Sequence, residues 1–186
     1  MNGGSLMNDS VFHRLYDEYH KDVFQFLLYM VKNRQTAEDL MHEVYVRVLK
    51  AFSRFEGKSS EKTWLFSIAK NVAIDHFRKS SVRKRHSFDF FDWDKQDLKS
   101  TEALPEELAQ MNDEMKQLLG ALDECTNDQK MVVIMRYFQD LSIIETAQVL
   151  GWSEGKVKTT QHRAIHKLRN RLSGHSDRRQ VHDEQQ

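Results

Sequence analysis

The chain has 186 residues and a mass of 22.0 kDa, enough for one or two domains with a buried core. Hydrophobic residues make up 39% of the chain, which excludes a wholly disordered protein. The formal net charge is zero, but the charges are segregated. Residues 57–85 carry eight basic and two acidic side chains (+6), residues 86–115 two and nine (−7), and residues 150–173 six and one (+5). Basic segments that flank an acidic one suggest contact with nucleic acid.

The composition favours helices and a reducing compartment. One proline and seven glycines are too few for the many turns of a sandwich or barrel, so we predict an all-α fold. Cys125 is the only cysteine, which excludes an internal disulfide and a zinc site of several cysteines. The N-terminal residues lack the pattern of a signal peptide, and the apolar stretch at 23–31 is too short to span a membrane.

Three helices are expected in a first domain over residues 7–80. Their apolar residues recur at spacings of three and four, which is typical of amphipathic helices. The first helix ends near Asn33, the second begins near Thr36, and Gly57–Ser60 forms a loop before the third. The expected inward-facing residues are Phe12, Leu15, Tyr16, Tyr19, Val23, Phe26, Leu27 and Met30; Ala37, Leu40, Val44, Val48, Ala51, Phe52 and Phe55; and Trp64, Leu65, Ile68, Ala69, Val72 and Phe77.

An acidic, aromatic-containing linker is expected over residues 81–105, because no helical period persists there. Pro105 can open the next helix, in a second domain over residues 106–173. The expected apolar stripe of that helix is Leu108, Met111, Met115, Leu118, Leu119 and Leu122. A short apolar helix follows around 131–138, and a polar tail occupies residues 174–186.

Residues 141–172 carry the strongest local pattern, which is that of a helix-turn-helix. Ser142 and Glu145 form a capping box at a helix start, Gly151 can end that helix, and Ser153 can cap the next one. We expect Ile144, Ala147 and Leu150 to face inward from the first helix, and Val157, Ala164, Ile165, Leu168 and Leu172 from the second.

The outer face of that second helix is basic. Lysine and arginine neutralise phosphates and bond guanine edges, and threonine and histidine add shorter polar contacts. The residues expected on this face are Lys156, Lys158, Thr159, His162, Arg163 and Arg169. The pattern favours DNA binding over an ordinary helical hairpin with a solvated basic face.

The basic segment at 57–85 combines cations with aromatic residues, as a single-strand binding surface does. Lys58, Lys62, Lys70, Arg78 and Lys79 could hold a backbone. Trp64 and Phe77 lie on the apolar stripe, so a place in the core explains them equally well.

Two sequence patterns suggest other chemistry but lack its context. Residues 151–155 match the G-x-S-x-G nucleophile elbow, yet a helix precedes the serine instead of a strand. His162 and His166 are four apart, but no third metal ligand lies within sequence reach. We therefore predict no enzyme, no catalytic residue, no metal site, no cofactor and no small-molecule substrate.

Several ordered strings resemble the sigma-70 family. Residues 37–40 with Glu43 resemble the AEDL..E signature of region two, and residues 63–79 resemble its TWL..IA.N..ID..RK block. Residues 155–164 resemble the region-four recognition helix. The strings FQFLLYMVK, FEGKSSEKTWL and KVKTTQHR resemble more narrowly an extracytoplasmic-function (ECF) member of this family from bacilli. His42 departs from the glutamine that family members usually carry.

The resemblance implies a two-domain transcription initiation factor that acts with bacterial core RNA polymerase. Region two would dock on the polymerase through Glu38, Asp39, Glu43 and Arg47. It would melt the minus-ten element and hold the separated strand through Lys58, Ser59, Ser60, Lys62, Lys70, Asn71, Asp75 and Arg78. Region four would read the duplex minus-thirty-five element through Lys156, Lys158, Thr159, His162 and Arg163. A membrane-associated anti-sigma factor and a cytoplasmic, nucleoid-associated location are also implied.

One alternative keeps the helix-turn-helix but needs no polymerase. A free-standing regulator would bind duplex DNA through residues 141–172 and use its first domain as a sensor or dimer surface. Such a regulator does not require the AEDL helix or the basic block at 57–85. The first domain therefore discriminates between the two functions.

Overall fold

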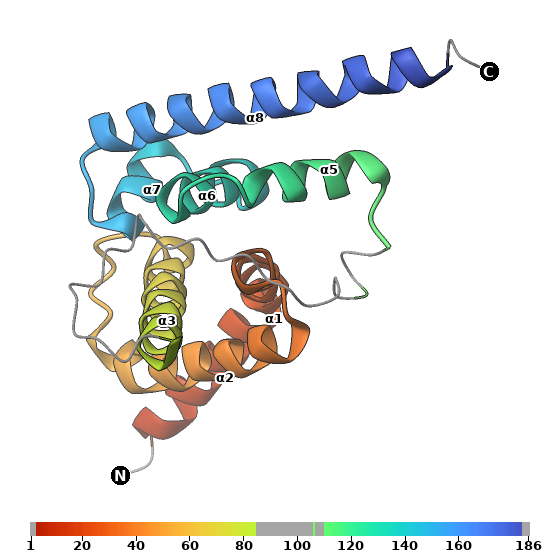
Figure 1. Ribbon diagram of the computed structural model, residues 1–186. Coiled ribbons are helices and arrows are strands. Elements are labelled where there is room, and N and C mark those ends of the chain that lie inside the picture. The colour runs from red at the N-terminus through yellow and green to blue at the C-terminus, as the bar shows by residue number, and fades with distance from the viewer. Residues whose placement is uncertain (1–2, 85–105, 107–109, 184–186) are drawn as a thin grey trace.

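The computed structural model describes residues 3–84, 106 and 110–183, and the side chains of residues 11–80, 106 and 110–173. Within these ranges the backbone forms helices and no strand, which confirms the predicted all-α class. Helices α1 to α3 make the first domain, and α5 to α8 make the second, which lies above it in Figure 1. Within the described ranges, we find no helical segment whose length and hydropathy would let it span a lipid bilayer.

The first domain contains α1 (Gly3–Val31), α2 (Arg34–Ala51), a short 3-10 turn (Phe52–Arg54) and α3 (Glu61–Lys84). Asn33 does not simply end the first helix, as predicted, but begins the second. Its side-chain oxygen accepts a hydrogen bond from the backbone nitrogen of Thr36 at 2.7 Å, so α2 begins at Arg34. Helix α3 continues to Lys84, beyond the predicted domain end at residue 80.

The second domain contains α5 (Asp113–Leu122), α6 (Asn127–Val133) with a π-helical turn η3 (Ile134–Phe138), α7 (Ile143–Leu150) and α8 (Glu154–Asp183). The stripe predicted from Leu108 is interrupted. Met111 precedes α5, because the side chain of Asn112 caps this helix by accepting from the backbone nitrogen of Met115 at 2.8 Å. The predicted polar tail continues the helix, since α8 extends to Asp183.

Two parts of the sequence predictions lie outside the described residues. The aromatic and acidic part of the linker, residues 85–105, and position 108 of the predicted stripe are among them.

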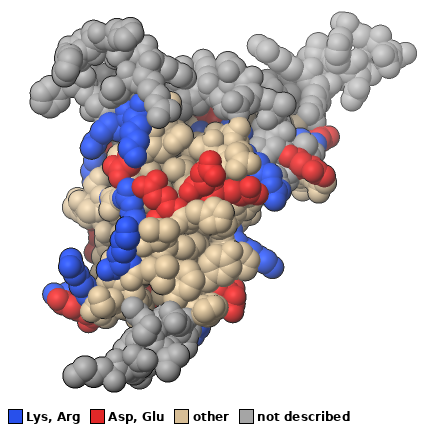
Figure 2. All heavy atoms as spheres, turned by 90° about the horizontal axis from the view of Figure 1, so that it is seen from below, with Lys and Arg blue, Asp and Glu red and all other residues tan. Residues whose placement is uncertain are grey.

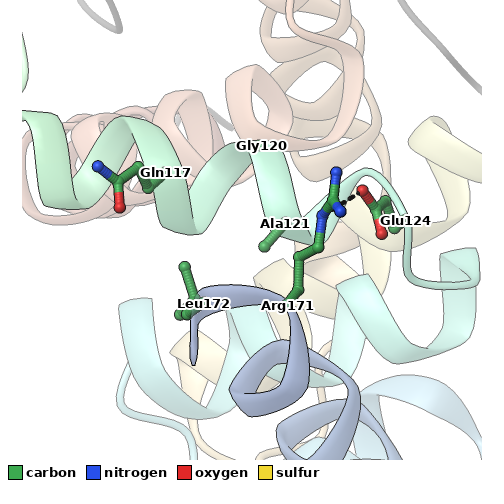
Figure 3. A pocket seen from close by; sticks show the side chains of 6 residues that line it. All are labelled: Gln117, Gly120, Ala121, Glu124, Arg171 and Leu172. Carbon is green, nitrogen blue, oxygen red and sulfur yellow. Dashed lines mark ion pairs between the residues drawn. The ribbon is translucent and has the colours of Figure 1, made fainter. Parts of the chain in front are cut away.

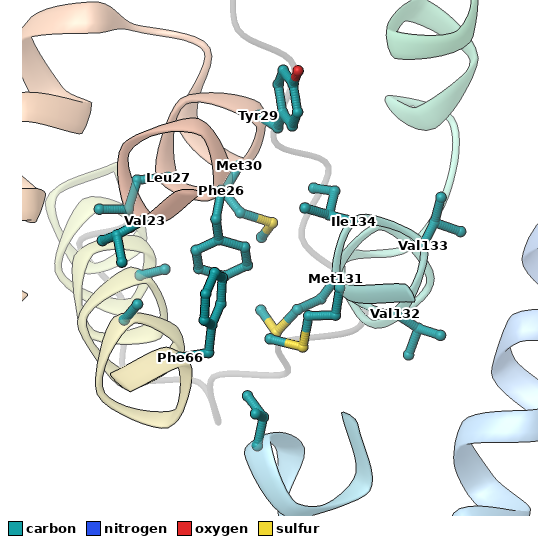
Figure 4. Packing of buried hydrophobic residues seen from close by; sticks show 14 of the residues in the cluster. Val23, Phe26, Leu27, Tyr29, Met30, Phe66, Met131, Val132, Val133 and Ile134 are labelled. Carbon is teal, nitrogen blue, oxygen red and sulfur yellow. The ribbon is translucent and has the colours of Figure 1, made fainter. Parts of the chain in front are cut away.

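A single hydrophobic core joins the two domains. Phe26 of α1 and Phe66 of α3 are fully buried and meet edge to face, with ring centroids 5.6 Å apart. Met131 and Ile134, also buried, lie opposite them on the second domain, as Figure 4 shows. Helix α3 packs against α7, and α1 packs against η3. Burial of this apolar surface is the main contribution that stabilises the contact between the two domains.

Candidate polymerase and nucleic-acid interfaces

The helix-turn-helix has the local geometry that its sequence predicts. Ser142 accepts from the backbone of Glu145 at 3.1 Å, and the Glu145 carboxylate accepts from the backbone of Ser142 at 2.8 Å. Gly151 ends α7 in the left-handed region at φ +69°, which a side chain would strain. Ser153 then accepts from the backbone of Lys156 at 3.2 Å. These contacts confirm the predicted caps and fix the angle at which α8 leaves α7.

Helix α8 buries one face and exposes the other, as its sequence predicts. Val157 and Ala164 are fully buried, and Leu168 is nearly so. The polar face is exposed to solvent along the same turns, and its members are Lys156, Lys158, Thr159, His162, Arg163 and Arg169. One inward prediction was wrong: Ile144 of α7 is 57% exposed, while its neighbour Ile143 packs against the core. Successive helical residues point about 100° apart, and at this position on α7 it is Ile143 that points toward the core.

Two basic side chains at the start of α8 already have partners. The ammonium of Lys156 lies 3.7 Å from the ring centroid of Trp152 and 3.7 Å from the Asp128 carboxylate. The ammonium of Lys158 lies 3.7 Å from the Glu154 carboxylate, and both side chains are exposed. Exposed ion pairs of this kind contribute little stability, so a phosphate can replace the carboxylate at Lys158.

A contact that the sequence does not reveal fixes α8 against η3. The guanidinium of Arg136 donates to the side-chain oxygen of Gln161 at 3.1 Å and to the backbone oxygen of Leu141. The Gln161 amide in turn donates to the Tyr137 hydroxyl at 2.9 Å. Arg136 thus connects the recognition helix to the segment before α7. Its partner on α8 lies 25 residues away, which is beyond any local sequence pattern.

The loop before α3 turns sharply and then caps the helix. Gly57 has φ +68°, a conformation that favours glycine, and Lys58 next to it is exposed. The Ser60 hydroxyl accepts from the backbone nitrogen of Thr63 at 3.1 Å and lies 2.8 Å from the Thr63 hydroxyl. Ser59 is partly exposed beside it. Ser60 therefore has a structural role at the start of α3.

Arg14 of α1 holds this end of α3 from the side. Its guanidinium donates two hydrogen bonds to the Glu61 carboxylate, at 2.6 and 2.8 Å. These bonds lower the pKa of Glu61 below its ordinary value. The ammonium of Lys62 lies 3.3 Å from the Asp22 carboxylate, also on α1. Neither contact of Arg14 or Asp22 is predictable from sequence spacing, because the partners lie on α3, with α2 between the two helices in the chain.

The DNA residues predicted along α3 differ in how far their side chains are exposed. Asn71 and Arg78 are exposed. Lys70 is half-buried, and this burial lowers the pKa of its ammonium. Asp75 accepts a hydrogen bond from the Arg47 guanidinium of α2 at 2.9 Å. Asp75 is thus engaged with the predicted polymerase-docking helix in this structure.

Trp64 lies among aromatic side chains that precede α3 in the chain. Its ring centroid lies 5.0 Å from that of Phe55 and 5.9 Å from that of Phe52. Phe77, further along α3, is 4% exposed. Both residues therefore have the packing role that the apolar stripe indicates, as does the fully buried Phe66.

The outward face of α2 carries charged side chains. Asp39 is exposed, Glu38 accepts from Arg34 at 2.8 Å, and Glu43 accepts from Arg47 at 2.6 Å. Figure 2 shows acidic and basic side chains gathered over this lower side of the molecule.

Two apolar residues on the same face of α2 were missed by the sequence analysis. Val46 is 48% exposed and Leu49 is 43% exposed. Val46 follows Asp39 by seven residues, two helical turns, and therefore lies on the same face. Helical periodicity assigns such positions to the polar face. An apolar side chain there is the signal that could have identified these residues.

A small pocket lies between α5 and α8, away from these surfaces. It has a volume of about 210 Å³ and contains the Arg171–Glu124 ion pair at 2.7 Å (Figure 3). Its lining residues are Gln117, Gly120, Ala121, Glu124, Arg171 and Leu172. None of the predicted DNA or docking residues is among these lining residues. Within the described part of the chain, no three His, Cys, Asp or Glu side chains are grouped as metal ligands would be.

Two family models match the chain, one in each domain. The model described as "Sigma-70 region 2" matches residues 15–83, and the one described as "Sigma-70, region 4" matches residues 121–170. The ECF RNA polymerase sigma factor SigX of Bacillus subtilis is 51% identical over 164 residues, which cover 88% of this chain and 84% of that protein. RNA polymerase sigma factor YlaC of the same organism is 30% identical, over 86% of this chain and 90% of that protein.

Solved structures share the arrangement of helices. The sigma factor RpoE of Bartonella quintana, in complex with the anti-sigma factor NepR, matches with a TM-score of 0.66 over 87% of this chain and 96% of that chain. CnrH, in complex with the cytosolic domain of CnrY, matches with a TM-score of 0.65. These two proteins are 20% and 18% identical to the chain, so the likeness concerns the fold.

Proposed function

The chain belongs to the sigma-70 family of RNA polymerase sigma factors, in its ECF group. From this premise we propose the role of each domain in transcription initiation. The chain is a transcription initiation factor that directs core RNA polymerase to promoter DNA. We propose that it has no catalytic activity of its own. The single observation that supports this function over a free-standing regulator is the match of residues 15–83 to region 2, a domain that such a regulator does not require.

Each domain is assigned the partner that it contacts. Residues 7–80 dock on core polymerase through Glu38, Asp39, Glu43 and Arg47 and open the minus-ten element, and residues 106–173 bind the duplex minus-thirty-five element. The support is the exposed, partly apolar face of α2 in the first domain and the exposed basic face of α8 in the second. Residues 81–105 connect the two domains. Anti-sigma factors are a further class of partner, as in the RpoE–NepR complex. Binding of polymerase and promoter would place the chain at the nucleoid.

A run-off transcription assay with core polymerase tests this function. The chain should produce promoter-dependent transcripts only when core polymerase is present. A free-standing regulator would instead bind the duplex and give no transcript with a cognate core and promoter, and that result would contradict the sigma-factor assignment.

Arg163→Ala should separate base reading from phosphate binding on α8. We expect a specific base contact to be worth about 1–3 kcal/mol, so the variant should lose affinity for the specific duplex and relax preference at one position. Lys158→Ala, at an exposed lysine on the same face, should weaken specific and random duplexes alike and give a shallower salt dependence. Fluorescence anisotropy at several salt concentrations measures both. Equal losses on specific and random DNA for both variants would show that α8 does not read sequence.

The Lys70→Ala, Asn71→Ala double variant should impair promoter opening. Opening without ATP requires tighter binding of the separated strand than of the duplex. The half-buried Lys70 and the exposed Asn71 supply a cation and an amide on α3 for the strand backbone and an extruded base. Transcription from duplex promoter should fall about tenfold or more, as expected for loss of one or two such contacts, while a template opened in advance should be used almost normally.

Permanganate reactivity of unpaired thymines measures opening directly. Lys21→Ala, at an exposed lysine of α1, is the matched control and should behave like the wild type. If the double variant opens the promoter with wild-type reactivity, the melting surface lies elsewhere on the first domain.

A further inference from the structure

The two domains meet across an interface that contains polar as well as apolar contacts. Tyr29 of α1 lies against Phe138 of η3, with ring centroids 5.0 Å apart. The Thr63 hydroxyl lies 3.5 Å from the Glu145 carboxylate, which brings the start of α3 to the start of α7. In Figure 1 the second domain rests on the ends of α1 and α3. The elements expected to bind the two promoter regions are therefore held close together.

An ionic cluster at this interface includes residues from both domains. The ammonium of Lys32, just after α1, donates to the backbone oxygen of Leu119 at 3.2 Å and to the carboxylate of Asp123. Lys130 of α6 donates to the other oxygen of the same carboxylate at 2.9 Å. Lys32 is 8% exposed and Lys130 is 4% exposed. One carboxylate thus holds two buried ammonium groups, one from each domain.

The backbone at Lys32 is itself unusual. Its φ is +54°, in the left-handed region that few residues other than glycine and asparagine adopt without strain. Its backbone nitrogen donates to the oxygen of Leu28 at 2.7 Å, so the residue closes the last turn of α1. A long charged residue in this conformation is unfavourable on local grounds. The contact with the second domain gives a reason for it.

A buried ion pair makes an arrangement specific without making it very stable. The free energy needed to remove two ammonium groups from water nearly equals the free energy gained from their attraction to the carboxylate. Removing one partner while the others stay buried is strongly unfavourable. Such a cluster therefore keeps the domains in one relative position yet allows them to separate when a competing partner binds.

If the chain acts as proposed above, its two domains must separate in order to bind both promoter elements at the same time. The minus-ten and minus-thirty-five elements are about 25 base pairs apart, roughly 85 Å along B-form DNA. In the closed chain α3 contacts α7, the helix that precedes the recognition helix. The closed arrangement cannot reach both elements at once.

We propose that Lys32, Asp123 and Lys130 form an interdomain latch that holds the free chain closed and is broken when the domains separate on polymerase. Lys32 is the part of the latch that tests this role, because the Lys130–Asp123 pair lies within the second domain. Lys32→Asn removes the cation and retains a residue that tolerates the left-handed conformation, so α1 should still end correctly.

Interdomain distance in the free chain measures the latch. Spin labels at Ser53→Cys and Gln148→Cys, two exposed positions on opposite domains, are placed in a Cys125→Ala background. The chain with Lys32 should give one dominant distance. Lys32→Asn should add a longer, broader population, with the open-to-closed ratio raised about tenfold or more. Lys21→Asn, which removes the same charge from the exposed side of α1, should leave the distance unchanged.

A second variant keeps the test decisive. Lys32→Met removes the charge but retains the length of the side chain, and it should also raise the open population, provided that circular dichroism shows wild-type helix content. If both folded variants reproduce the wild-type distance, the latch is overturned. Because this measurement uses neither polymerase nor promoter, its failure is distinguishable from failure of the proposed function in run-off transcription.

Discussion

Asp39→Arg and Val46→Asp should each weaken binding to core RNA polymerase by about 2 kcal/mol or more, roughly thirtyfold in affinity. Asp39 is exposed on α2, and Val46 exposes 48% of its surface two turns further along the same face. Reversing the charge at Asp39 would place like charges together if the partner surface is basic. Adding a carboxylate at Val46 would desolvate a charge in an apolar contact.

Both variants should remain folded. Neither side chain lies in the core, so we expect the free energy of unfolding to change by no more than about 0.5 kcal/mol. Titration of labelled core polymerase measures the affinity, and urea unfolding verifies the fold. Lys21→Asp, a charge reversal on the exposed side of α1, is the control and should bind core normally. Unchanged core affinity in both α2 variants would exclude this face as the docking surface.

Phe66→Ala should lower the free energy of unfolding by about 3–5 kcal/mol. Phe66 is fully buried, packs edge to face against Phe26 and points toward the second domain in Figure 4. The substitution removes the apolar contacts of the ring and leaves a cavity that the surrounding helices can fill only in part. The midpoint of urea denaturation, followed by circular dichroism, measures this loss.

Phe66→Leu is the matched control for this prediction. It retains most of the apolar volume, so its loss should be clearly smaller than that of Phe66→Ala. Equal midpoints for the alanine variant and the wild type would show that Phe66 is not part of a packed core. Trp64→Ala is expected to lower stability as well as activity, because its ring packs on Phe52 and Phe55.

Local features of the fold were predictable from sequence because their partners are near neighbours in the chain. The Ser142–Glu145 capping box, the left-handed Gly151 and the Ser153 cap each depend on residues within a few positions. The basic face of α8 follows from helical periodicity alone. Composition and apolar spacing predicted an all-α fold with two helical domains, and the resemblance of several ordered strings indicated the family.

The sequence was less reliable where two neighbours compete for one position. Ile144 is as apolar as Ile143, and periodicity alone does not decide which of them faces the core. The structure exposes Ile144, and Val46 and Leu49 are exposed on α2 in the same way. Two helices begin at other residues than the apolar spacing predicts, because Asn33 and Asn112 cap them. A side chain that bonds the backbone of the next turn starts a new helix instead of continuing the preceding one.

By itself, the sequence determined the helices, their caps and the basic recognition face, since these depend on periodicity and on neighbours along the chain. The family followed from the resemblance of several ordered sequence strings to known members. The tertiary structure alone decided which charged residues from different helices meet. Asp75 lies against Arg47, 28 residues away, and Lys32 lies against Asp123, 91 residues away. The chemical type and position of a side chain indicate what it can bind. Its actual partner depends on which helices pack together, and long-range packing leaves no periodic pattern in the sequence.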